Sequence, residues 1–140
     1  MKNILLLSLL LVSFSAFTQS KQQDVQNLLT VLKIKPTMLN MVNTGIDLYK
    51  RQKPLVPQNT WDNIKNLVDY TLYVNKIAGI FNNNYTQPEL KHLIILAQKA
   101  KPGKQPKFKP AVKTLLYNAG NEFGKQFASL IKEELRLKGY

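Results

Sequence analysis

Apolar residues recur at intervals of three or four along most of this 140-residue chain, which is the spacing of one face of an α-helix. No segment shows the strict alternation of apolar and polar residues that marks a half-buried strand. The pattern therefore predicts an all-α fold, a small bundle of about five helices. The apolar stripes that predict these helices lie at Val25–Leu32, Met38–Tyr49, Trp61–Phe81, Leu90–Ala97 and Ala111–Leu137.

The stripe from Trp61 to Phe81 predicts one long helix with two adjacent apolar lines, as expected for a helix that is covered over a wide face. Thr60 is the candidate N-cap, since its hydroxyl can accept a hydrogen bond from a backbone amide of the first turn. Asp62 then falls in that first turn, near the positive end of the helix dipole. Asn82 to Asn84 are expected to end the helix.

The start of the next helix is predicted at Thr86, because Thr86 and Glu89 have the spacing of a capping box. Pro88 falls in the first turn, where its missing N–H group is not needed. The following stretch, Lys99–Pro110, carries three prolines and one glycine and is expected to be a non-helical connection.

The first eighteen residues have the order of a secretory signal peptide, with a basic start, a short apolar core at Ile4–Val12 and small polar residues up to Thr18. A retained anchor is the alternative, but a spanning helix needs about 20 apolar residues and this core is shorter. Cleavage is expected after Thr18, with Ser20 as a second candidate. We therefore expect a bacterial chain that is exported, periplasmic or secreted, and a single helical domain over residues 19–140 with no transmembrane span.

The chain is strongly basic, with 20 Lys and Arg against 8 Asp and Glu and a formal net charge of +12 at pH 7. This surplus favours anionic partners such as phosphate-bearing lipids, lipopolysaccharide, nucleic acid or acidic proteins, although solubility alone is the alternative. Nucleic acid is the least available of these outside the cytoplasm. The absence of cysteine excludes disulfides and the lipid-modified type of export signal.

The order of motifs in the second half of the chain resembles a known family. Trp61 opens a helix, Tyr85 precedes the Thr86-Gln87-Pro88-Glu89-Leu90 helix start, and a Lys101-Pro102-Gly103-Lys104 turn precedes the last helix. From Trp61 to Tyr140 the chain is similar to a bacterial exported helical family catalogued as a domain of unknown function, number two-zero-five-nine. The resemblance implies export and a helical fold, and it implies no activity. The family usually has a Phe-Tyr pair where this chain has Ala97-Gln98.

The reactive side chains do not assemble into a recognisable catalytic or metal-binding set. Glu89 and His92 are spaced as Glu-x-x-His, but a carboxylate-bridged metal pair needs a second such motif and further carboxylates, so no metal or other cofactor is expected. Ser129 has Glu133 one turn later but no base of the usual kind. We therefore expect that the protein is not an enzyme.

A lysine-rich segment precedes and enters the last helix, with no acidic residue within it. Each lysine near an anionic surface contributes about 1 kcal/mol, and Phe108 is the candidate apolar anchor. The alternative is a solvated loop whose Phe108 packs back on the bundle. Interleaved aromatic rings that would stack on bases are absent, so nucleic acid is not the expected partner. The candidate binding residues are Lys99, Lys101, Lys104, Lys107, Phe108, Lys109 and Lys113.

The sequence thus favours a non-catalytic exported helical protein that binds an anionic envelope surface or a protein partner through this lysine-rich segment. Candidate partners are anionic lipid, lipopolysaccharide and an envelope protein. The alternative is a purely structural or homo-oligomeric interaction module with no anionic ligand.

Overall fold

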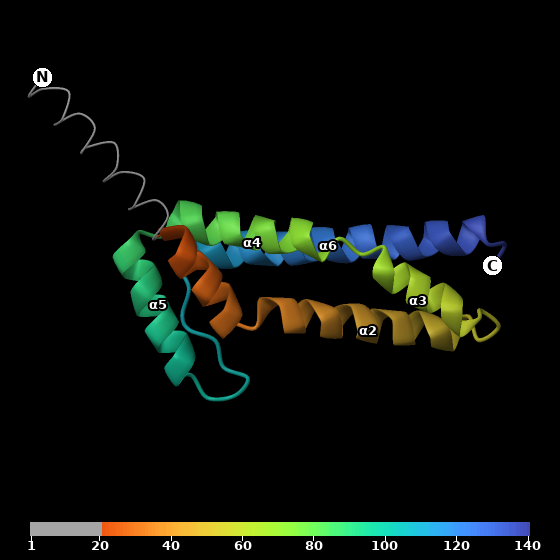
Figure 1. Cartoon of the computed structure of the whole chain (residues 1–140), viewed down its shortest axis with the longest axis horizontal. Coiled ribbons are helices and arrows are strands. Elements are labelled where there is room, and N and C mark those ends of the chain that lie inside the picture. The colour runs from red at the N-terminus through yellow and green to blue at the C-terminus, as the bar shows by residue number, and fades with distance from the viewer. Residues whose placement is uncertain (1–20) are drawn as a thin grey trace, which may run out of the picture. The chain divides into compact units, whose positions relative to one another are not determined.

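The computed structural model describes residues 21–140, which are all-α and contain no strand (Figure 1). Residues 21–31 are helical, which confirms the first apolar stripe, and the expected signal peptide at residues 1–18 lies outside the described range. The all-α class predicted from the sequence is therefore confirmed. The remaining helices are α2 (Ile34–Gln52), α3 (Gln58–Asn66), α4 (Tyr70–Asn84), α5 (Gln87–Lys99) and α6 (Pro110–Leu137).

The described chain divides into two compact units, and the division runs through α4. The first unit contains the helical residues up to Leu32 together with Ala78–Lys107, which include the end of α4 and all of α5. The second unit contains Lys33–Ile77 and Phe108–Tyr140, with α2, α3, the start of α4, and α6. The single domain expected over residues 19–140 stays a prediction, because compactness does not show whether either unit folds alone.

The first unit is held together by buried apolar side chains and by hydrogen bonds between distant segments. The Asp24 carboxylate accepts a hydrogen bond from Gln87 Nε2 at 2.9 Å, and Lys21 Nζ donates to the carbonyl of Asn82 at 2.7 Å. These bonds join the helical residues near the N-terminal end to α4 and α5. The buried apolar residues of this unit are Val25, Leu28, Leu29, Phe81, Tyr85, Leu90, Leu93 and Ile94.

The predicted capping box at the start of α5 is confirmed. Thr86 is the N-cap, and its backbone amide donates to Glu89 Oε2 at 2.7 Å. Pro88 lies in the first turn of α5, where its missing N–H group leaves no helical bond unmade. The capping box defines the first residue of α5.

The second unit is built around Trp61, which is only 1% exposed. The Trp61 indole N–H donates to the carbonyl of Val56 at 3.3 Å, so the one polar atom of this side chain is satisfied inside the core. Helix α2 supplies three side chains spaced by four, as a helical core face requires. The core cluster consists of Met38, Val42, Ile46, Val56, Trp61, Ile64, Val68, Phe123, Ile131 and Leu135.

The single long helix expected from Thr60 to Phe81 is wrong, because the chain breaks after α3 and restarts as α4. The side chain of Asp69 accepts a hydrogen bond from the amide of Leu72 at 2.9 Å, which caps the start of α4. Thr60 is not an N-cap but a buried residue inside α3, whose N-cap is Pro57. The three asparagines expected to stop the helix are its last helical residues.

The expected connection before the last helix is confirmed. Helix α5 ends at Lys99 and α6 begins at Pro110, where proline is favoured because the first helical amide has no partner. Of the helices between residues 21 and 140, none is long and apolar enough to cross a membrane.

Candidate functional site

The lysine-rich segment runs out of α5, along the connection and into the first turn of α6 (Figure 1). Its first four lysines belong to the first unit, whereas Phe108, Lys109 and Lys113 belong to the second. The side chains of all six lysines are exposed. We call residues 99–107 the basic connection, because this part lies within one unit and can be described as one surface.

A tight turn forms the middle of the basic connection. The amide of Lys104 donates to the carbonyl of Lys101 at 2.9 Å, and Gly103 has a φ of 78°. Proline at the second position and a left-handed glycine at the third are the residues that a type II turn demands. The turn therefore holds Lys101 and Lys104 close together, on either side of a rigid Pro102-Gly103 corner.

Phe108 does not lie open on this surface. Its side chain is 7% exposed, which corresponds to the alternative in which the ring packs on the protein and not to an apolar anchor. A buried ring cannot enter a membrane or stack on a base without first leaving its position. The basic connection therefore presents lysines to the solvent without the aromatic residue that the sequence placed among them.

The carboxylates of the first unit are engaged away from the basic connection. Among its described residues the acidic ones are Asp24 and Glu89. Asp24 accepts from Gln87, and Glu89 closes the capping box of α5. Neither of these interactions involves Lys99, Lys101, Lys104 or Lys107, whose side chains are exposed.

Helix α5 exposes two large aliphatic side chains that are not among the predicted binding residues. Ile95 is 47% exposed and Leu96 is 39% exposed. The buried face of α5 carries Leu90, Leu93 and Ile94, so it leaves the next two residues on the opposite side. The sequence indicates this exposure, because Ile95 and Leu96 are apolar residues that fall outside the predicted buried stripe of this helix.

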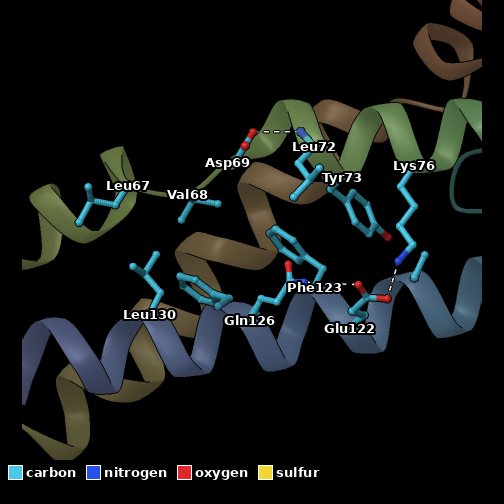
Figure 2. Close-up of a pocket in the computed structure, with 12 residues that line it drawn as sticks. Leu67, Val68, Asp69, Leu72, Tyr73, Lys76, Glu122, Phe123, Gln126 and Leu130 are labelled. Carbon is cyan, nitrogen blue, oxygen red and sulfur yellow. Dashed lines mark hydrogen bonds and ion pairs between the residues drawn. The ribbon is translucent and has the colours of Figure 1, made fainter.

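The second unit has an apolar groove between α4 and α6, of about 250 Å³ (Figure 2). Its floor contains Tyr73 of α4 and Phe123 of α6, whose ring centroids are 4.9 Å apart. Leu67 and Leu72 also line the groove, and both are exposed. This volume lies below the range of about 300–1,000 Å³ that is typical of small-molecule sites. The groove therefore suits a side chain of a partner better than a substrate.

Polar groups stand at the edges of this groove. Lys76 of α4 and Glu122 of α6 form an ion pair, and Asp69 caps α4. Both side chains of the ion pair are about half exposed, so the pair contributes about 0–1 kcal/mol. Burial raises the pKa of the Tyr73 phenol above its usual value. These groups orient the two helices but do not form an acid–base pair.

The residues considered for metal or nucleophilic chemistry are in two different units, Glu89 and His92 in the first and Ser129 in the second. Glu89 is part of the capping box, His92 is exposed on α5, and Ser129 is exposed on α6. Between residues 21 and 140, no group of three His, Asp or Glu side chains is placed to hold a metal ion.

Comparisons with known proteins leave the family undetermined. No family model, no curated protein and no solved structure matches this chain. The similarity of residues Trp61–Tyr140 to the exported helical family therefore stays a prediction.

Proposed function

We propose that this protein is a non-catalytic, exported bacterial protein that binds an anionic surface of the cell envelope through the basic connection. The observation that carries this proposal is the set of four exposed lysines at Lys99, Lys101, Lys104 and Lys107, in a unit whose two described carboxylates are engaged elsewhere. Exposed lysines along an extended connection suit a laterally extended charged surface. Anionic lipid or lipopolysaccharide provides that chemistry.

The structure of the basic connection supports this proposal over nucleic acid. A site for single-stranded nucleic acid places aromatic rings between its basic residues, and the ring at this position, Phe108, is buried. The prolines and the turn at Lys101–Lys104 also restrict the segment before binding, which lowers the conformational entropy that binding must remove.

Vesicle binding at two salt concentrations tests this function. We expect the purified protein to sediment with vesicles that contain phosphatidylglycerol and not with vesicles of phosphatidylcholine alone. Raising the salt from about 0.1 M to about 1 M shortens the Debye length from about 10 Å to about 3 Å, and should release most of the bound protein. Equal sedimentation with both kinds of vesicle, or binding that ignores salt, would contradict the proposal.

A second candidate function is a structural or homo-oligomeric interaction module without an anionic ligand. The groove between α4 and α6 favours it, because Leu67 and Leu72 are exposed beside an apolar floor. Under this alternative, substitutions in the groove would alter the oligomeric state, and substitutions in the basic connection would not.

A further inference from the structure

We infer that the outer face of α5 is a second part of the binding surface and inserts Ile95 and Leu96 into the apolar region of an anionic phospholipid bilayer. This inference rests on the proposed function, and it names the surface as a bilayer and not as a soluble polyanion. It also replaces Phe108 with two exposed residues as the apolar anchor.

The geometry of α5 places these apolar residues among cations. Lys91, Ile95 and Lys99 are spaced by four, so they lie along one line of the helix surface. His92 and Leu96 form a neighbouring line, again spaced by four. All five side chains are exposed, which makes a band with basic groups at both ends and aliphatic groups in its middle.

The carboxylate of α5 lies at one end of this band, one turn before His92. Glu89 is the acidic residue of the helix, and it is held by the capping box at the opposite end from Lys99. The turn that carries Lys101 and Lys104 follows directly in the chain, because α5 ends at Lys99. The exposed lysines of the turn and the band on α5 thus belong to the same unit.

The charge and apolar pattern fits the interface of an anionic bilayer. Lysine ammonium groups remain at the phosphate level while their alkyl chains follow the apolar side chains inward. Helices that lie in such an interface combine apolar residues with lysine and arginine. A soluble polyanion would engage the lysines but would offer nothing apolar to Ile95 and Leu96.

The test replaces both aliphatic residues, as Ile95→Ser with Leu96→Ser in the full chain. We expect partitioning onto phosphatidylglycerol vesicles to weaken by about tenfold or more, because two large apolar side chains no longer leave water. Binding to heparin, a soluble polyanion, should stay unchanged because every lysine remains. The matched control is Met41→Ser with Leu39→Ser on α2, whose side chains are 47% and 41% exposed.

Each outcome bears on the inference. It is supported if the α5 variant loses vesicle binding, keeps heparin binding, and differs from the α2 control. If the unmodified protein binds vesicles and the α5 variant binds them equally well, the inference is overturned and the proposed function stands. A parallel loss on vesicles and heparin also overturns it, since the substitution then acts through the fold. If the unmodified protein does not bind vesicles, both fail.

Discussion

Replacing Trp61 with alanine is expected to lower the free energy of unfolding by about 3–5 kcal/mol. The side chain is 1% exposed within the core of the second unit, so its removal leaves a large cavity. The indole hydrogen bond to the carbonyl of Val56 is lost as well. Since small domains are stable by about 5–15 kcal/mol, this change removes a large part of the total. Urea unfolding followed by far-ultraviolet circular dichroism measures the difference without relying on tryptophan fluorescence.

Leu55→Ala is the matched control for this prediction. Leu55 is close to Trp61 in the sequence but is 90% exposed, so its truncation should change the unfolding free energy by less than about 0.5 kcal/mol. A loss below about 1 kcal/mol in the Trp61 variant, or equal losses in both variants, would mean that the core of the second unit is not centred on Trp61.

Neutralising the four lysines of the basic connection is expected to weaken binding to phosphatidylglycerol vesicles by about a hundredfold to a thousandfold at low salt. The variant carries Lys99→Gln, Lys101→Gln, Lys104→Gln and Lys107→Gln. Each lysine near an anionic surface contributes about 1 kcal/mol, and about 1.4 kcal/mol corresponds to a tenfold change in affinity. The fold should persist because all four side chains are exposed.

The control for net charge neutralises four exposed lysines of the second unit, namely Lys35, Lys53, Lys125 and Lys132. It removes the same number of charges, so any effect of overall charge is shared by both variants. We expect the control to keep most of its vesicle affinity. Equal weakening in the two variants would show that binding follows net charge and not the basic connection.

The sequence predicted those parts of the fold that depend on local patterns. The capping box of Thr86 and Glu89 and the prolines of the connection each depend on a few neighbouring residues, and each is found where it was expected. The last helix is also found, although Leu115 of its predicted stripe is exposed. The break between α3 and α4 could not be found in this way. Leu67 and Leu72 continue the apolar pattern through it, so the pattern predicts one helix, whereas tertiary packing buries Val68 and leaves both leucines exposed.

Of the candidate binding residues, the sequence predicted the exposure of the lysines but left the burial of Phe108 as an alternative. The exposure of the lysines follows from their charge, but burial of Phe108 depends on contacts that sequence spacing does not encode. Gly45 likewise has a role that depends on a long-range contact. A Cβ atom on Gly45 would lie 2.7 Å from Cε1 of Phe127, a close approach between α2 and α6 that no local motif announces.

A fluorophore on residue 105 tests most directly whether the basic connection is the contact surface. The chain has no cysteine, so Gln105→Cys can be labelled at one place, and Asn43→Cys on α2 serves as a second exposed position. With phosphatidylglycerol vesicles, the emission of an environment-sensitive dye at residue 105 should shift to shorter wavelength, while that of a dye at residue 43 should not. A shift of equal size at both positions, or none at residue 105 in protein that sediments with the vesicles, would contradict the assignment of the contact surface.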